Sequence, residues 1–431
     1  MITKQEMLQL LRQEVIPALG CTEPICAAFA AADAAKAVGG NVKSIYAEMN
    51  PNLYKNGMSV SIPNSPRMGM DVAVALGAIL RNPQKKLEVL EDIQPETLAE
   101  AYKLLDNNVV NVRIDDSEKE LYVKVMVTTS NGVGTSIIRG AHTNIVLTTV
   151  DGNVIFKKDT EDQASGDDVI ERLKLMKVSE IRQLVDTADN NELQFMMDGV
   201  VMNEALAQYD IQNVGGVGVA ATIQKQIKEG ILSDSLQSRV MLKAAAAAEG
   251  RLGGCPLPTM SSSGSGTKGV VVILPIYEVA QEVKASEIAT LKALAFGHLM
   301  NRYINAYIGK LGAVCSCSMA SATATCAAMT WLYGGTDEQI GFAIRNMTAA
   351  VSGMICDGGK VGCALKAVMT TTSALTNALL ASNSVVLHVS DGICAETPEQ
   401  CIRNMARIAN PGMVHTDKEI LNIMLEKSGK K

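Results

Sequence analysis

The spacing of apolar residues changes along the chain, and the first part of it is helical. Residues 2–15 place apolar side chains at helical intervals, and Pro17 ends the helix that this spacing predicts. A second helix is predicted over residues 24–38, where Pro24 suits the first turn. The segment ALGCTE connects the two predicted helices.

Between residues 44 and 158 the pattern becomes that of strands, interrupted by a helix near residues 67–81. The strand segments alternate apolar and polar residues or are rich in β-branched ones. Asn131-Gly132 and Asp151-Gly152 predict hairpin turns, because both dipeptides favour the tight turns that join antiparallel strands. The predicted strands are 44–49, 59–63, 108–115, 121–130 and 145–158.

From about residue 170 onward the apolar spacing is helical again, with breaks at glycine-rich joints. The pattern therefore predicts an α+β fold, with a mixed α/β domain (1–168) followed by an all-α helical domain (169–431). The clearest helical segments are 177–210, 233–249, 284–309, 317–332, 337–350, 364–381 and 396–409. The joints are 213–218, 250–269, 309–312, 334–335 and 357–362.

Composition narrows the class of protein. Hydrophobic residues make up 47% and charged residues 19%, which supports a large buried core. The net charge is −6 without a block of like charges, so neither nucleic acid nor a membrane surface is an expected partner. The longest apolar run, 269–277, is too short to span a bilayer. We expect a soluble cytoplasmic protein whose ten cysteines are reduced, buried, metal-bound or catalytic rather than disulfide-bonded.

Four cysteines lie at or near glycine-flanked joints between predicted helices. Residues 315–317 read CSC, and residues 354–366 read MICDGGKVGCALK, which contains Cys356 and Cys363. Glycine lets the backbone approach a bulky ligand closely. The spacing matches neither a zinc finger nor a ferredoxin. From the residues alone, metal ligation and simple burial of the thiols both remain open.

Two other segments carry groups suited to a substrate carboxylate. The loop PTMSSSGSGTKG (258–269) precedes an apolar run, and backbone amides at the start of a helix bind anions. Residues 51–63 place Lys55 and Asn56 at a turn between two predicted strands. The alternative for each segment is a solvated surface loop. The candidate substrate-binding residues of the first loop are Ser261, Ser262, Ser263, Gly264, Ser265 and Gly266.

Four motifs together resemble the L-cysteine desulfidase family, which is also described as serine dehydratase α-subunit-like proteins of uncertain function. They are PALGCTEP (17–24), NLYKNGM (52–58), SSSGSG (261–266) and MICDGGKVGCALK (354–366). The resemblance runs from about residue 5 to about residue 410. The chain is more distantly similar to the iron–sulfur L-serine dehydratases.

This resemblance implies a [4Fe-4S] cluster held by Cys315, Cys356 and Cys363, with Cys317 or Cys21 as alternative ligands. Three thiolate ligands leave one iron open, and an open iron acts as a Lewis acid on a leaving group.

The resemblance also implies the remaining roles. Cys21 is expected to be the base, if helix ends or Lys55 lower its pKa. Glu23 is expected to pair with the substrate ammonium. Lys55, Asn56 and the loop 261–266 are expected to hold the substrate carboxylate.

The activity that the resemblance implies is that of a β-eliminating lyase, which converts L-cysteine to sulfide, ammonia and pyruvate. The alternatives are the same chemistry on L-serine or another small amino acid, and a non-enzymatic protein that binds a small molecule or a metal such as zinc. The expected partner is a small amino-acid substrate, and the Ala/Gly-rich helical surface would suit a homodimer.

Overall fold

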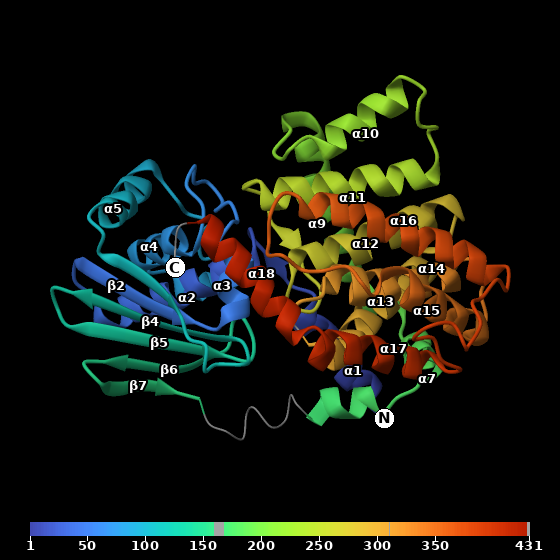
Figure 1. The fold of residues 1–431 in the computed structure, drawn as a ribbon, viewed down its shortest axis with the longest axis horizontal. Coiled ribbons are helices and arrows are strands. Elements are labelled where there is room, and N and C mark those ends of the chain that lie inside the picture. The colour runs from blue at the N-terminus through green and yellow to red at the C-terminus, as the bar shows by residue number, and fades with distance from the viewer. Residues whose placement is uncertain (159–167, 310, 429–431) are drawn as a thin grey trace.

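The structure is a computed structural model that describes residues 1–158, 168–309 and 311–428. A mixed sheet with its covering helices lies beside a larger helical body (Figure 1). This arrangement confirms the predicted α+β fold class. The predicted domain boundary at 168/169 directly follows residues 159–167, which lie outside the described residues, and it stays a prediction.

The sheet has six strands in the order β3-β2-β4-β5-β6-β7. β2 and β3 are parallel, and the other neighbouring pairs are antiparallel. The turns at Asn131-Gly132 and Asp151-Gly152 connect β4 to β5 and β6 to β7, which confirms both predicted hairpins. The strands are β2 (Val42–Met49), β3 (Val110–Ile114), β4 (Tyr122–Thr129), β5 (Val133–Arg139), β6 (Ile145–Val150) and β7 (Asn153–Lys157).

The predicted strand over 59–63 is wrong, and so is the turn predicted before it. Residues 59–63 make one isolated bridge, between Ser61 and Met68. The preceding segment is a helix, α3 (Pro51–Gly57), which places Lys55 and Asn56 on helical backbone. Proline fits the first turn of a helix, and this helix ends at Asn56-Gly57, a dipeptide that also favours turns.

Two helices cover one face of the sheet, α2 (Thr22–Val38) and α4 (Met70–Leu80), and both confirm predicted helices. The alanines of α2 are almost fully buried. A Cβ atom built on Gly77 of α4 would lie 2.1 Å from the carbonyl oxygen of Ala28. The helices therefore pack at a distance that small residues alone permit. Besides α3, the sheet side has the short 3₁₀ helix η1 (Pro83–Glu88) and α5 (Pro95–Asp106), which were not predicted either.

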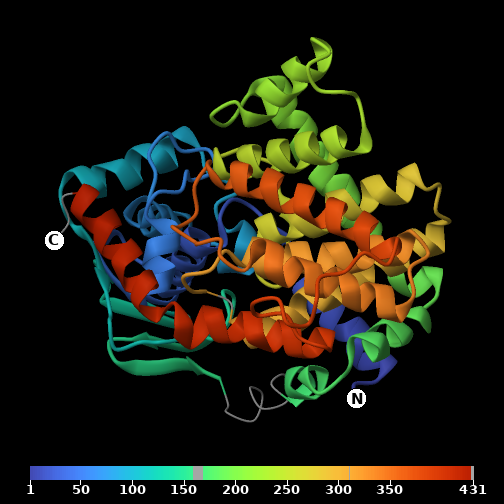
Figure 2. The same cartoon turned by 45° about the vertical axis from the view of Figure 1, so that its right-hand side comes forward.

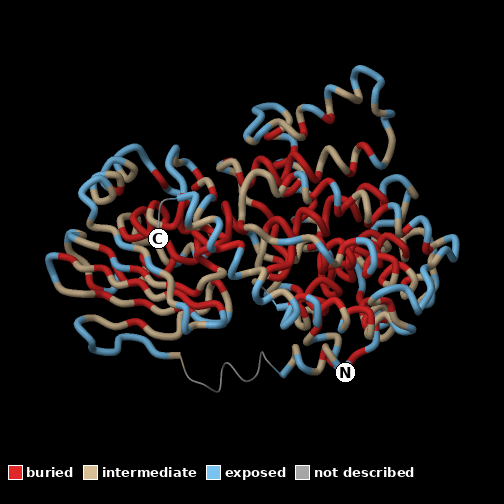
Figure 3. Tube along the Cα trace, viewed as in Figure 1, coloured by how far each residue is buried: buried red, intermediate tan, exposed pale blue. Residues whose placement is uncertain are grey.

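In the helical body, α12 (Gly266–Glu282) consists mostly of buried residues. Figure 3 shows that buried residues fill the interior of the helical body, while exposed residues lie at its periphery. The predicted segment 177–210 contains three helices rather than one. No helix within the described ranges is long and apolar enough to cross a membrane. The other helices are α7 (Val178–Asp186), α8 (Asn190–Leu193), α9 (Met196–Asn213), α10 (Val219–Lys228), α11 (Leu236–Leu252), α13 (Glu287–Ile308), η2 (Cys317–Ala322), α14 (Thr323–Leu332), α15 (Asp337–Val351), α16 (Cys363–Ser382), α17 (Pro398–Arg407) and η3 (Ile408–Gly412).

Each end of the chain packs against the part of the molecule that the other end of the chain mainly forms. The first helix, α1 (Lys4–Glu14), buries Met7 and Leu11 in the core of the helical body. The last helix, α18 (Val414–Lys427), leaves the helical body and crosses to the sheet (Figures 1 and 2). There Leu421 joins the core between α2, α4 and the sheet. Each end of the chain therefore helps to hold the two parts together.

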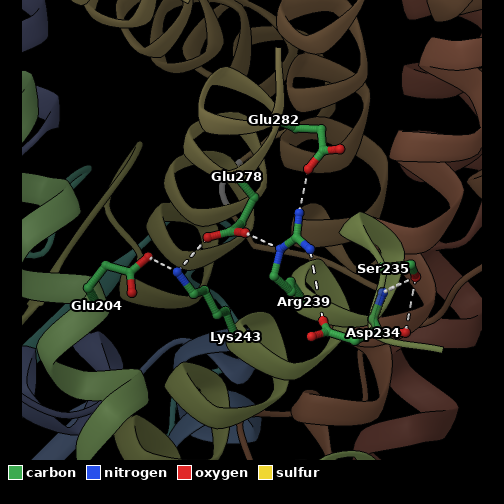
Figure 4. Close-up of polar contacts among 8 residues, drawn as sticks. Glu204, Asp234, Ser235, Arg239, Lys243, Glu278 and Glu282 are labelled. Atoms are coloured by element: carbon green, nitrogen blue, oxygen red, sulfur yellow. Dashed lines mark hydrogen bonds and ion pairs between the residues drawn. The ribbon is translucent and has the colours of Figure 1, made fainter. Parts of the chain in front are cut away.

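An ion-pair network links three helices of the body at its surface (Figure 4). Glu278 of α12 accepts from Arg239 at 3.3 Å and from Lys243, both on α11. Lys243 also pairs with Glu204 of α9 at 2.6 Å. Because the Glu278 side chain is only 7% exposed, this carboxylate depends on its two cationic partners for compensation.

We predict that Glu278→Gln lowers the free energy of unfolding by about 1–3 kcal/mol, because a neutral amide leaves Lys243 and Arg239 with a weaker buried partner. Urea denaturation measures the change. Glu282→Gln is the matched control, since Glu282 pairs with Arg239 but is 50% exposed, and its effect should stay within about 0.5 kcal/mol. Equal losses in the two variants would contradict the importance of the buried carboxylate.

Candidate active site

Two short backbone pairings bring distant segments of the chain together. β1 (Pro17–Ala18) pairs antiparallel with β8 (Thr259–Met260), which sets the GCTE segment beside the serine-rich loop. A single bridge between Val314 and Ile355 sets Cys315 beside Cys356. All of these segments border one cavity of about 1260 Å³.

Most of the residues predicted from the sequence line this cavity. Its wall includes Cys21, Glu23, Asn56, Ser263, Gly264, Ser265, Cys315, Cys317, Cys356 and Cys363. The other predicted residues, Lys55, Ser261, Ser262 and Gly266, are buried or packed behind this wall. The wall also includes Arg251 and His142, which the sequence analysis did not identify.

The thiols of the helical body differ in their readiness to ionise. A hydrogen bond from Cys317 lowers the pKa of Cys315 to about 6. The same hydrogen bond, together with burial, raises the pKa of Cys317. Burial raises the pKa of Cys356 to about 11 and also raises that of Cys363. Cys315 is therefore the thiol of this group that ionises most readily.

All four of these thiols line the cavity wall. Among the residues that the structure describes, no three His, Cys, Asp or Glu side chains form a group that could hold a single metal ion. Cys363 begins α16, and its Sγ donates to the carbonyl of Gly358 at 3.7 Å. Soft sulfur donors that surround a space are suited to a group larger than one ion, such as an iron–sulfur cluster.

On the sheet side of the cavity, Cys21 and Glu23 form a buried hydrogen-bonded pair. Cys21 Sγ donates to Glu23 Oε2 at 2.9 Å, and Asn56 Nδ2 donates to Glu23 Oε1 at 3.2 Å. Cys356 Sγ in turn donates to Asn56 Oδ1 at 3.8 Å. Asn56 therefore connects the carboxylate of the sheet side with a thiol of the helical body.

The pKa of Cys21 is shifted in the direction opposite to the expected one. Burial and the neighbouring Glu23 carboxylate raise it well above the usual thiol value. For Glu23, burial opposes ionisation, but His142, the hydrogen bond from Cys21 and Arg251 outweigh it and lower the pKa. The resting pair is thus a protonated thiol beside a carboxylate, and the expected activation of Cys21 by a lowered pKa is wrong.

Lys55 has a different position from the expected one. Its side chain is 1% exposed, and Nζ donates to the carbonyls of Gly312 at 3.0 Å and Cys356 at 3.1 Å and to the carboxylate of Asp417. An ammonium has three hydrogens, and these three acceptors use all of them. Lys55 therefore positions the segment around Cys356 and has no donor left for a substrate carboxylate.

The serine-rich loop has a structural side and a side that faces the cavity. Ser261 Oγ donates to Ile16 O at 2.7 Å, and Ser262 Oγ accepts from Asn301 Nδ2 at 2.7 Å. Ser263 and Gly264 both have positive φ, which bends the loop into the cavity wall. Substrate contact stays a prediction for Ser263, Gly264 and Ser265, while Ser261 and Ser262 hold the loop in place.

Arg251 and His142 carry no sequence signal of their own. Arg251 follows an alanine-rich helical run, and His142 lies in the turn between β5 and β6. Both are buried, at 2% and 7% exposure, by segments distant in the sequence. A local pattern could not have indicated that burial.

The cavity lies where the sheet side and the helical body adjoin, and it is lined by thiols, the buried carboxylate of Glu23 and the first turn of α12. The chain belongs to the serine dehydratase alpha chain family, whose model matches residues 84–422. This finding confirms the predicted resemblance to serine dehydratase α-subunit-like proteins.

Relatives of this chain match it over nearly their whole length. A UPF0597 protein of Clostridioides difficile (strain 630) is 36% identical over 420 residues, which cover 97% of this chain and 98% of the relative. A UPF0597 protein of Alkaliphilus oremlandii (strain OhILAs) is 36% identical and covers 99% of both chains. A third, from Alkaliphilus metalliredigens (strain QYMF), is 37% identical over 98% of this chain and 95% of its own.

We predict that Lys55→Met lowers the free energy of unfolding by about 3–5 kcal/mol, because it leaves two carbonyls and Asp417 without their donor. Urea denaturation measures this loss. Alkylation followed by peptide mapping should show faster modification of Cys356. The control is Lys85→Met, whose partners Glu91 and Asp92 are 56% and 53% exposed, with an expected change within about 0.5 kcal/mol. Unchanged stability and unchanged Cys356 reactivity would contradict the positioning role.

Proposed function

We propose that the chain is a β-eliminating lyase that releases sulfide and ammonia from L-cysteine and leaves pyruvate. The observation that carries this proposal is the shared cavity: four thiols, the Cys21–Glu23 pair and the start of α12 all border it. Membership of the serine dehydratase alpha chain family supports elimination from a small amino acid as the type of reaction.

The donor set fits a [4Fe-4S] cluster. Cys315, Cys356 and Cys363 would hold it, with Cys317 or Cys21 as the alternative ligands. The pKa of Cys315 is lowered from the usual thiol value, mainly by the hydrogen bond from Cys317, and the charge of Lys366 contributes to this shift. When bound through three cysteines, such a cluster supplies an open iron that acts as a Lewis acid on the leaving group.

The Cys21–Glu23 pair would move the α-proton. In the proposed step Cys21 Sγ accepts the proton from the substrate Cα while its own proton passes to Glu23 Oε2, along the 2.9 Å hydrogen bond. The electron pair of the Cα–H bond forms the Cα–Cβ double bond, and the Cβ–S electron pair leaves with sulfide. Water then converts the resulting aminoacrylate to pyruvate and ammonia.

The same residues could act on L-serine, in which hydroxide rather than sulfide leaves Cβ. The family description favours this second candidate. Sulfide release from L-cysteine and pyruvate formation from L-serine, measured on one preparation, give the preference between them.

We predict that anaerobically purified protein holds about four irons per chain and releases sulfide from L-cysteine. Cys356→Ser should lose both iron and activity, because a serine hydroxyl is a poor ligand for iron–sulfur clusters. Cys21→Ser should keep its iron and lose about 100-fold to 10,000-fold in kcat, the range typical of general acid–base groups. Iron analysis and sulfide assays on the same samples measure both effects.

Cys394→Ser is the control for both cysteine variants. Cys394 is buried beside the carbonyl of Arg345, at 3.7 Å, and should change neither iron content nor activity. Loss of iron in Cys21→Ser would make Cys21 a ligand instead of the proton acceptor. Wild-type protein with neither iron nor turnover would overturn the lyase proposal and favour a small-molecule binding role.

A further inference from the structure

Arg251 is a buried cation with most of its hydrogen-bonding capacity unused. The side chain is 2% exposed and lines the cavity. Nη1 donates to Thr267 Oγ1 at 2.7 Å, but Nε and Nη2 have no hydrogen-bond partner within the described part of the chain. Glu23 interacts with Arg251 electrostatically but accepts no hydrogen bond from it among the described residues. Because buried donor nitrogens without an acceptor destabilise the fold, the position of Arg251 favours an anionic ligand that accepts from them.

The start of α12 lies against this guanidinium and is itself incomplete. Its N-cap residue, Ser265, makes no side-chain cap, and Gly266 and Thr267 of the first turn are buried. A Cβ built on Gly266 would lie 2.3 Å from Arg251 Nε, so the side chain crosses directly over the first residue of the helix. The positive end of the helix dipole and the guanidinium therefore face the same space.

The helix that carries Arg251 shows how a carboxylate satisfies such a helix start. Two residues earlier on α11, the buried Glu249 caps α10. Its carboxylate accepts from the backbone amides of Gly218 at 2.9 Å, Val219 at 3.1 Å and Ala220 at 2.8 Å. Among the described residues, no carboxylate accepts from the amides at the start of α12, which has the arginine alone. A ligand carboxylate has the chemistry that this position lacks.

We propose that Arg251 and the first turn of α12 bind the α-carboxylate of the substrate, and that Glu23 faces its ammonium, so that the site selects free zwitterionic α-amino acids. A planar guanidinium can bind a carboxylate through two parallel hydrogen bonds, which an ammonium side chain cannot reproduce. Amines without a carboxylate and amino-acid esters would bind poorly. This inference deepens the proposed lyase function and rests on it.

L-alanine is the probe for this subsite, because it carries the same ammonium and carboxylate but no leaving group. Isothermal titration of the anaerobic holoenzyme should show that L-alanine binds and that ethylamine, which lacks the carboxylate, does not. Arg251→Met should weaken L-alanine binding about 100-fold, and Arg251→Lys about 10-fold, because lysine keeps the charge but not the paired geometry. Arg239→Met, on the same helix but at the surface network of Figure 4, should bind as wild type does.

Thermal melting separates a binding role from a structural one. Because Arg251 lacks protein partners for Nε and Nη2, Arg251→Met should melt at or above the wild-type temperature. L-alanine affinity in Arg251→Met equal to that of wild type would overturn the inference, even where wild type releases sulfide from L-cysteine. If Arg251→Met does not fold, Arg251→Lys decides, since wild-type affinity in that variant also contradicts the inference. Absence of both L-alanine binding and turnover in wild type would reject the lyase and this subsite together.

Discussion

The candidate site depends on one buried ammonium. Lys55 lies on a helix of the sheet side, while its three acceptors belong to Gly312, Cys356 and Asp417, separated from it by 257 to 362 positions in the sequence. A buried cation is tolerated because three acceptors surround it. Two of them, the carbonyls of Gly312 and Cys356, belong to segments of the helical body, and Asp417 belongs to α18, which crosses to the sheet. Lys55 and its neighbour Asn56 therefore connect α3 to the segment of Cys356, and the site is complete only when the sheet and the helical body are docked.

The charges around the cavity are arranged for anions. Arg251, Lys268 and Lys366 line its wall, and Glu23 is the carboxylate that pairs with Cys21. Lys268 donates to Asn305 Oδ1 at 2.9 Å and to the carbonyl of Ser263 at 3.3 Å, which fixes its charge under the serine-rich loop. Cationic side chains near thiols favour the thiolate form, and they also compensate a ligand carboxylate. The same cationic side chains would therefore stabilise thiolate ligands and the carboxylate of an amino-acid substrate.

The sequence predicted what local patterns determine. Helical spacing gave α1, α2 and α4, and the Asn-Gly and Asp-Gly turns gave both hairpins, since these elements depend on neighbouring residues. The error at α3 has a local cause, because its Asn-Gly end is also a turn signal. The predicted role of Lys55 was wrong for a different reason. Its three acceptors are distant in the sequence, so no local sequence pattern could indicate them. The family motifs predicted that the cysteines belong to one site, and the cysteines do line one cavity. The pKa of Cys21 could not be predicted in this way, because it depends on burial in the folded chain.

The two sides of the serine-rich loop show where the fold leaves polar groups incomplete. Behind the wall, Ser261, Ser262 and Asn301 satisfy one another or nearby carbonyls. On the wall, Ser263 Oγ and two nitrogens of Arg251 have no hydrogen-bond partner among the described residues. Folding alone favours satisfying all of these groups, because each unsatisfied polar atom weakens the native state. Polar groups left without a partner on the wall of one cavity are what a preorganised ligand site requires, since groups already satisfied by the protein would have to be released before a ligand could bind.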